Sequence, residues 1–422
     1  VNILYSIVDR MFVGQIEEVG NVCLAAVGIC GPIVTLLSSF GTLVGIGGSI
    51  WLSMCLGQKN EKRASQILYN SFVMLVVLSI CLTLGFILLK HNLIYWFGGS
   101  DALYPYANTY LTIYTLGTFF ALMSIGLNYF ITGQGYATIA MLSVCIGAIT
   151  NIVFDFILIR TLKIGVAGAA IGTVVAQFIS CMFVLCFLRF KSKIKLHKEE
   201  LSIEKMKHIV KLGFSPFLII ASDSIILIVM NMMLQKYGGN MGDVYISAIT
   251  VAQSYFLLIT GPLLGISSGT QPIFAYHFGS QNLKKIKEAF KIVISFAFLF
   301  CLVMFIISMC YSNVFVAMFT NDAMTMPIAD RAIKIFCLGI LMMSIQYVLV
   351  DGITGLSNVK LSLFLSLNRK LMYLGCTCLL PAFLGVSNIF YAQPTADIYA
   401  SIVTIICFIK IIPSYLKSHG VK

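Results

Sequence analysis

QILYNSFVMLVVLSICLTLGFILLK, residues 66–90, decides the fold class of this chain. From Gln66 to Leu89 the stretch contains no charged residue, and most of its side chains are apolar. An α-helix needs roughly 20 mainly apolar residues to cross the hydrocarbon core of a bilayer. The stretch is therefore predicted to be a transmembrane helix.

Comparable apolar stretches follow one another along the whole chain. Of its 422 residues, 59% are hydrophobic and 10% are charged, whereas soluble domains carry about 25% charged residues. Bounded by Gly, Pro, Asn or charge, these stretches predict an all-α membrane protein with about twelve spans: 1–14, 28–56, 66–90, 108–132, 137–159, 166–188, 209–235, 246–275, 287–312, 329–355, 360–384 and 395–416. The first span is too short to cross a bilayer, so we expect the natural first helix to be truncated here.

The Lys and Arg residues gather on one side of this predicted topology. If the first span runs outward, most of the 28 basic residues lie on the other side, in segments 57–65, 189–211, 276–291, 356–370 and the C-terminal tail. Loops rich in Lys and Arg face the cytoplasm. We therefore expect a multi-pass membrane protein with both termini in the cytoplasm. This topology accounts for the net charge of +12 without a nucleic-acid partner.

A repeat relates the two halves of the chain. A shift of 222 residues, without gaps, brings GQKNEK at 57–62 onto GSQNLK at 279–284. The same shift pairs identical residues far apart in each half: Ala26 with Ala248, Gly47 with Gly269, Asn60 with Asn282, Gly117 with Gly339, and Gly133 with Gly355. Repeats of six spans with the same orientation are typical of transporters that handle substrate between two lobes. We predict lobes at 1–190 and 212–422.

The hydrophilic segment 191–211 lies between these predicted lobes. Two interpretations fit its many Lys residues. It is either an amphipathic helix on the anionic inner surface of the membrane or a solvated connector.

Several motifs together resemble one family of transporters. IVDRMFVGQ at 7–15, LAAVGICGPI at 24–33, GQKNEKRAS at 57–65 and TNIVFDFILI at 150–159 resemble the multidrug and toxic compound extrusion family in their order and spacing. The resemblance covers essentially the whole chain. It implies two six-helix lobes around a central cavity, and antiport of organic cations against Na⁺ or H⁺.

Acidic residues inside the predicted spans are candidates for the coupling site, because charge within a bilayer is costly. Asp9 and Asp155 both lie about 7 Å from the outer ends of their spans at 1.5 Å per residue. Asn151 precedes Asp155 by one helical turn, and Thr173 lies at nearly the same depth in the next span. We predict that these four residues form the coupling site. The resemblance implies the same assignment.

The chemistry of this predicted site allows two coupling ions. Two carboxylates, an amide oxygen and a hydroxyl suit a hard cation such as Na⁺. Alternatively, two nearby carboxyl groups suit a proton carrier, because burial and mutual repulsion disfavour the doubly ionised state. Two structural alternatives also exist: Asp9 in an ion pair with Arg10 or Arg160, and Thr173 bonded back to its own helix. No other cofactor is expected.

In the second half of the repeat, uncharged residues stand at the positions equivalent to this acid pair. Asp9 corresponds to Asn231 and Asp155 to Thr377, so the acids occur in one half only, which the needs of the scaffold do not explain. Other residues in the spans are candidates for the substrate cavity, with packing as the alternative for the aromatic and Met side chains: Asp223, Asp351, Tyr110, Asn128, Tyr255 and Met230.

The predicted function is secondary active export of small organic cations by a monomer surrounded by membrane lipids. The alternative within the same superfamily is a flippase for lipid-linked oligosaccharides, which would need a strongly cationic cavity. The basic residues are expected at the cytoplasmic edges and the deep charges are expected to be acidic, so cationic cargo is favoured. The motifs of metalloproteases and phosphate-binding loops are absent from the sequence, so an enzyme is not expected.

Overall fold

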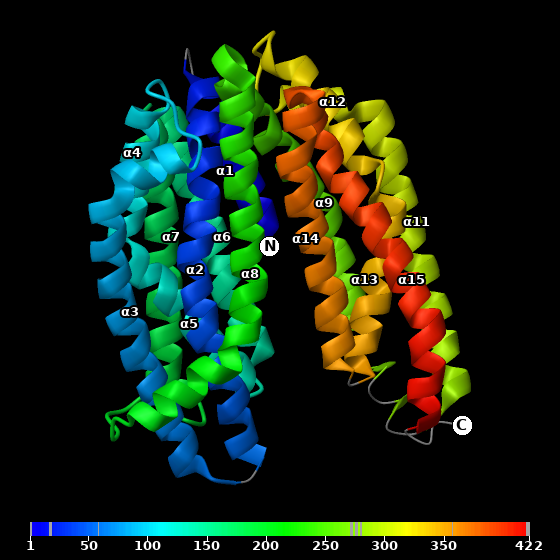
Figure 1. Cartoon of the computed structure of the whole chain (residues 1–422). Helices are drawn as coiled ribbons and strands as arrows, with labels where there is room; N and C mark the ends of the chain where they lie inside the picture. The colour runs from blue at the N-terminus through cyan, green and yellow to red at the C-terminus, as the bar shows by residue number, and fades with distance from the viewer. Residues whose placement is uncertain are drawn as a thin grey trace. The chain divides into compact units, whose positions relative to one another are not determined.

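The computed structural model is built of long α-helices (Figure 1). It describes residues 2–16, 19–57, 59–270, 273–274, 277–278, 281–356 and 358–418. No strand occurs among these residues, which confirms the predicted all-α class. The chain divides into two compact units, Val1–Met232 and Met233–Lys422.

The first unit is a bundle around the long helix α2. Its helices are α1 (Asn2–Gly14), α2 (Gly20–Gly57), α3 (Glu61–Trp96), α4 (Tyr104–Leu116), α5 (Thr118–Gly133), α6 (Ala137–Asp155), α7 (Val166–Cys186) and most of α8 (Ile203–Gly238). Short π-helical segments, Phe156–Thr161 and Phe187–Lys191, extend α6 and α7. α2 packs on α3 and α5, α6 packs on α7, and α1 packs on α6.

The second unit repeats this arrangement. It contains α9 (Gly242–Gly269), α11 (Leu283–Ala317), α12 (Thr325–Cys337), α13 (Ile340–Gly355), α14 (Val359–Leu384) and α15 (Ala392–Ser418). α14 packs on α15 as α6 packs on α7, and α9 contacts α13 as α2 contacts α5.

The predicted spans correspond to these helices. Seven stretches of the described residues are long and apolar enough to cross a membrane, and the bent pairs α4–α5 and α12–α13 raise the number to nine. One of the seven, Ile220–Ser267, contains parts of both α8 and α9. Counting α8 and α9 as separate spans, and adding the short α1 and the charge-bearing α14, gives about twelve spans, in agreement with the prediction.

The repeat extends to single backbone features. Asn60 and Asn282, one 222-residue shift apart, cap α3 and α11 through their side-chain oxygens, each 3.0 Å from a backbone nitrogen. The residues before them, Lys59 and Gln281, both have positive φ angles, 58° and 55°. The bends of 55° and 48° between α4 and α5 and between α12 and α13 also fall one shift apart, at Gly117 and Gly339. A shared ancestral unit, rather than chance similarity of apolar helices, explains this agreement.

Side chains of α3 and α11 form the lipid-facing surface expected of spans. Exposed apolar residues recur on one face of α3 at Val77, Ile80, Leu84 and Leu88, the last 81% exposed. Leu299 and Ile306, the counterparts of Val77 and Leu84, are exposed on α11. Soluble monomers rarely present such continuous apolar faces.

The segment between α7 and α8 agrees with the two sequence-based interpretations only in part. Residues 193–202 adopt no helix, and α8 begins at Ile203. Ser192 and Ile194 are buried, and Ile194 exchanges two backbone hydrogen bonds with the side chain of Gln134, at 2.8 and 3.3 Å. The segment is therefore an extended strap packed onto the first unit, and the prediction of an amphipathic helix is wrong for these residues.

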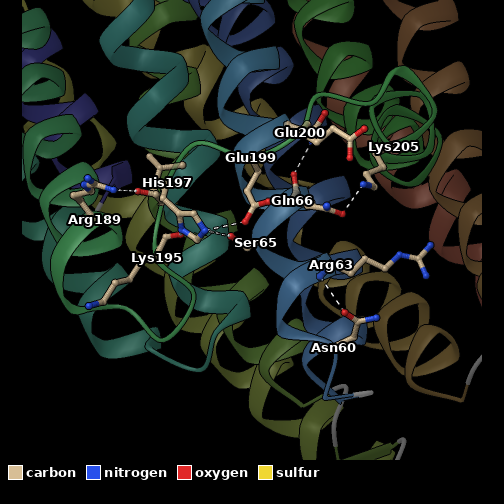
Figure 2. A network of polar contacts seen from close by, with 12 residues as sticks. Asn60, Arg63, Ser65, Gln66, Arg189, Lys195, His197, Glu199, Glu200 and Lys205 are labelled. Carbon is tan, nitrogen blue, oxygen red and sulfur yellow. Dashed lines mark hydrogen bonds and ion pairs between the residues drawn. The ribbon is translucent and has the colours of Figure 1, made fainter.

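Polar contacts hold this strap against the start of α3 (Figure 2). His197 Nε2 lies 2.8 Å from Glu199 Oε1 and 3.2 Å from Ser65 Oγ. The first turn of α8 is tied to α3 as well, because Lys205 Nζ donates to Gln66 Oε1 at 2.6 Å. The structural division at Met232 falls near the end of α8, whereas the sequence-based boundary at residue 212 falls near its start.

Candidate functional site

Asp155 is the last residue of α6, at the point where the α-helix changes into a π-helical segment. π-helical turns inside helices are frequent at functional sites. Its side chain is fully buried against Gly172 of α7. A Cβ atom at Gly172 would lie 2.4 Å from Asp155 Oδ1. The glycine therefore makes the space in which the carboxyl group sits.

Asp9 approaches the same place from α1. It is 7% exposed, and its carboxyl group lies within hydrogen-bonding range of that of Asp155. The structure therefore brings together the two acids that the sequence placed at one depth. Arg10 also interacts electrostatically with Asp9, and its guanidinium lies against Gly31 of α2, where a Cβ would be 3.5 Å from Nη2.

Asn151 and Thr173 complete the group on the adjacent helix faces. The Asn151 amide donates to Asp155 Oδ1 and to Thr173 Oγ1, both at 3.4 Å. The Thr173 hydroxyl donates to the Ala169 carbonyl at 3.0 Å, as the alternative interpretation of this residue expected. That bond uses the hydroxyl proton and leaves an oxygen lone pair directed at the group.

Three buried oxygen atoms of this group have no hydrogen-bond partner within the described part of the chain: Asp9 Oδ1, Asn151 Oδ1 and Asp155 Oδ2. Buried acceptors are normally satisfied, and an exception calls for an explanation. A small cation coordinated by these oxygens, or a proton shared by the carboxyl groups, would satisfy them. No cluster of three or more His, Cys, Asp or Glu side chains that could hold a metal ion occurs in the described ranges.

A pocket of about 440 Å³ opens beside the group, between α5, α6 and α7. Asn151 and Thr173 belong both to the group around the acid pair and to the wall of this pocket. The other polar side chains that line it are Ser124, Asn128, Tyr129, Thr132, Ser143, Gln177 and Ser180.

The structure places the candidates for the substrate cavity in different surroundings. Asn128 lines this pocket and donates to Ser143 Oγ at 3.0 Å. Tyr110 is buried and interacts electrostatically with both acids. Met230 is fully buried, and Tyr255 packs edge-on against Phe315; neither lines this pocket.

The two remaining acidic candidates lie on helices other than those of the acid pair. Asp223 is exposed on α8. Asp351 is half-buried on α13 in the second unit. Neither residue lines the pocket.

The sequence analysis missed a buried ion pair in the second unit. Arg369 of α14 contacts Asp397 of α15 at 2.8 Å, and Gln393 donates to the second carboxylate oxygen, also at 2.8 Å. Arg369 also lies over the ring of Tyr347, 5.2 Å from its centroid. Asp397 is fully buried.

This ion pair corrects the expectation that the deep charges are all acidic. Segment 356–370 was placed at the cytoplasmic edge, but Arg369 lies in the interior of α14, which begins at Val359. An Arg in one apolar stretch and a lone Asp in the next were the available signal. Their pairing depends on how the two helices face one another.

The fold and the site define a class of protein: a polytopic membrane protein of two repeated six-helix lobes, with an acid pair buried in the first. The chain belongs to the MatE family, whose sequence profile matches residues 1–157 and 220–372. This membership confirms the resemblance seen in the motifs.

Individual relatives agree with this assignment. The multidrug export protein MepA of Staphylococcus haemolyticus is 24% identical over 404 residues, which cover 94% of this chain and 87% of that protein. A solved inward-facing multidrug resistance MATE family transporter of the MOP superfamily matches with a TM-score of 0.91 at 23% identity, covering 99% of this chain and 96% of that one. The solved structure of the MATE multidrug transporter DinF-BH is 28% identical with a TM-score of 0.77, covering 97% of this chain and 92% of that one.

Proposed function

We propose that this protein is a secondary active exporter that exchanges organic cations for Na⁺ or H⁺ by alternating access. One observation carries the proposal: the Asp9–Asp155 pair is buried with unpartnered oxygens around it. The equivalent positions of the second half, Asn231 and Thr377, carry no charge. A scaffold that repeats so closely does not need the acids for folding, so they are assigned to coupling.

The four residues of the site perform the coupling through charge. Two carboxyl groups buried side by side repel when both are ionised, and either a proton or a Na⁺ ion relieves that repulsion. With H⁺, one carboxyl group donates a hydrogen bond to the other. With Na⁺, the amide oxygen of Asn151 and the hydroxyl oxygen of Thr173 supply neutral ligands beside the two acids.

The proposed cargo is a small organic cation, and the proposed location is a bacterial or archaeal plasma membrane with both termini in the cytoplasm. The names of the relatives, multidrug export proteins and multidrug transporters, support this class of cargo, as does the acidic character of the site. The protein is proposed to act as a monomer without enzymatic activity.

The flippase alternative gains little from the buried Arg369. A cationic cavity for a lipid pyrophosphate needs positive charge that is available to the ligand. The guanidinium of Arg369 is instead engaged by the Asp397 carboxylate and by the Tyr347 hydroxyl, at 2.8 and 3.3 Å. This pairing favours a structural role for Arg369.

Transport by purified protein in lipid vesicles tests the proposal. A fluorescent organic cation should be exported only when a Na⁺ or a pH gradient is imposed, and other lipophilic cations should compete. Lipid-linked sugars should have no effect. Inhibition by anionic lipid intermediates alone, with no response to either gradient, would replace the exporter by the flippase.

A further inference from the structure

The pocket beside the acid pair runs along the first unit rather than ending at the site. Its wall includes Asn151 at one end of α6 and Ala137 at the other. These residues are separated by about 21 Å at 1.5 Å per residue. Ala137 and the neighbouring Thr132 lie beside Gln134, which is bonded to the strap at Ile194. The pocket therefore leads from the acids toward the end of the bundle that carries the basic strap.

Polar side chains follow the pocket on all three helices at helical spacing. They are Ser124, Asn128 and Thr132 on α5, Ser143 and Asn151 on α6, and Thr173, Gln177 and Ser180 on α7. On α5 and α7 these residues are three or four apart and share one face of the helix, and Ser143 and Asn151 of α6 line the same space.

The amide oxygens along this route lack donors. Asn128 Oδ1, Asn151 Oδ1 and Gln177 Oε1 are buried, and none has a hydrogen-bond partner among the residues that the structure describes. Water molecules or a partly hydrated cation supply the donors or the charge that these acceptors need. At about 30 Å³ per molecule, the pocket has room for on the order of ten waters.

The second unit carries different side chains at three of the positions that correspond to the pocket. Under the 222-residue shift, Asn128 corresponds to Val350 and Ser143 to Leu365, both apolar. Gly147, which lines the pocket, corresponds to Arg369, whose side chain forms the buried ion pair with Asp397 on the neighbouring helix. The scaffold thus does not require the pocket's side chains at these three positions.

We propose that the pocket between α5, α6 and α7 is a hydrated path within the first unit, and that the coupling ion moves through it between the Asp9–Asp155 site and the basic end of the bundle. The ligand is a small monovalent cation or a proton, and the path is separate from the route of the organic cargo. This inference rests on the proposed role of the acid pair in coupling.

Closing the path tests the proposal, and the second half of the chain supplies the substitutions. The double variant Asn128→Val with Ser143→Leu copies Val350 and Leu365 into the pocket. The control, Thr138→Leu, makes a similar polar-to-apolar change on an exposed position of α6 that does not line the pocket. The rate of gradient-driven export is measured in vesicles, and equilibrium binding of Na⁺ or H⁺ is measured on purified protein.

The expected result separates movement of the ion from binding. The double variant should export at least about tenfold more slowly than the control, with ion binding changed by less than about twofold. Export at the control's rate would show that the ion does not use the pocket. If ion binding and export fall by the same factor, the pocket is part of the ion-binding site or of the cargo site. That result would also contradict the proposed path.

Cysteine labelling tests hydration independently of transport, including the case in which the double variant does not fold. In a chain without its native cysteines, Ser143→Cys should react with a small, membrane-impermeant thiol reagent added on the basic side. Leu142→Cys, on the exposed side of the same helix, should not react within lipid. An unreactive Cys at position 143 would overturn the path. If the acid pair has no role in coupling, the Asp155→Asn variant should instead export at the wild-type rate.

Discussion

At the scale of single residues, the acid pair differs from the buried Asp397 in its unpartnered oxygens. Asp397 is as buried as Asp155, but its two oxygens are engaged by Arg369 and Gln393. Asp9 and Asp155 each retain a buried oxygen without a partner among the described residues. A satisfied buried ion pair is consistent with a structural role, whereas an unsatisfied acid pair is consistent with binding of an exchangeable ion.

Asp9→Asn and Asp155→Asn should each abolish gradient-driven export while the protein remains folded in the membrane. The amide keeps the size of the side chain and removes the charge that a cation or a proton neutralises. Export of a fluorescent cation from vesicles measures the effect.

Asp101→Asn is the matched control for this pair, because Asp101 lies exposed in the turn between α3 and α4. It should export like the wild type. Wild-type export by both site variants would place coupling elsewhere, with Asp223 the next residue to test. Asn231→Ala, at the position equivalent to Asp9, removes the hydrogen bond from the amide to the Gly28 carbonyl. It should lower the free energy of unfolding by about 1 kcal/mol.

Thr173→Ala should distinguish the two coupling ions. If Na⁺ is the ion, loss of the hydroxyl oxygen removes a ligand, and the Na⁺ concentration for half-maximal export should rise about tenfold, the effect of roughly 1.4 kcal/mol. If H⁺ is the ion, export should change little, because the hydroxyl carries no titrating proton. A strong loss of pH-driven export in this variant would contradict that assignment.

At the scale of helices, close approach between neighbours positions the charged side chains. α6 and α7 meet at Gly172, where the Asp155 carboxyl group occupies the place of a Cβ. In the second unit, α14 and α15 are joined instead by Arg369 and Asp397. The same pair of helices in the two halves thus has different interhelical contacts.

Gly172→Ala should impair coupling and lower the thermal stability. The new methyl group would lie 2.4 Å from Asp155 Oδ1, so either the carboxyl group or α7 must move. Gly85→Ala is the control, because nothing lies within 4 Å of a Cβ at that position of α3. This control should be neutral or slightly stabilising, by up to about 1 kcal/mol. Melting temperatures and export rates of the two variants measure the difference, and equal behaviour would show that Gly172 does not set the site.

Asp397→Leu should destabilise the protein by about 3–5 kcal/mol, because it leaves the buried Arg369 without its counter-charge. Combining it with Arg369→Met should recover most of this loss, since no unpaired charge then remains. Thermal unfolding of the single and double variants checks the coupling between the two residues. A double variant as unstable as the single one would show that the positive charge of Arg369 is not the cause.

At the scale of the whole molecule, the distribution of basic residues sets the expected orientation. The strap with Lys198 and the start of α11 with Lys285 belong to predicted cytoplasmic segments. Single cysteines at these two positions should react with membrane-impermeant reagents only from the cytoplasmic side. A cysteine at Ser100, between α3 and α4, should react only from outside. The reverse pattern would invert the topology.

The sequence by itself determined the spans, the repeat, the family and the two acids of the site. These features depend on local information: the length and periodicity of apolar stretches, a constant 222-residue shift, and charges isolated in apolar surroundings. Even the caps at Asn60 and Asn282 follow from residues adjacent in the chain.

Only the tertiary structure decided which side chains meet. The contact of Asp9 with Asp155, the space at Gly172, the polar pocket and the Arg369–Asp397 pair each join different helices. Such contacts depend on the rotation and the separation of neighbouring helices, which the sequence of either helix alone does not fix. Arg369 was therefore assigned to a cytoplasmic edge from its neighbours in the chain, although its partner lies on the next helix in space.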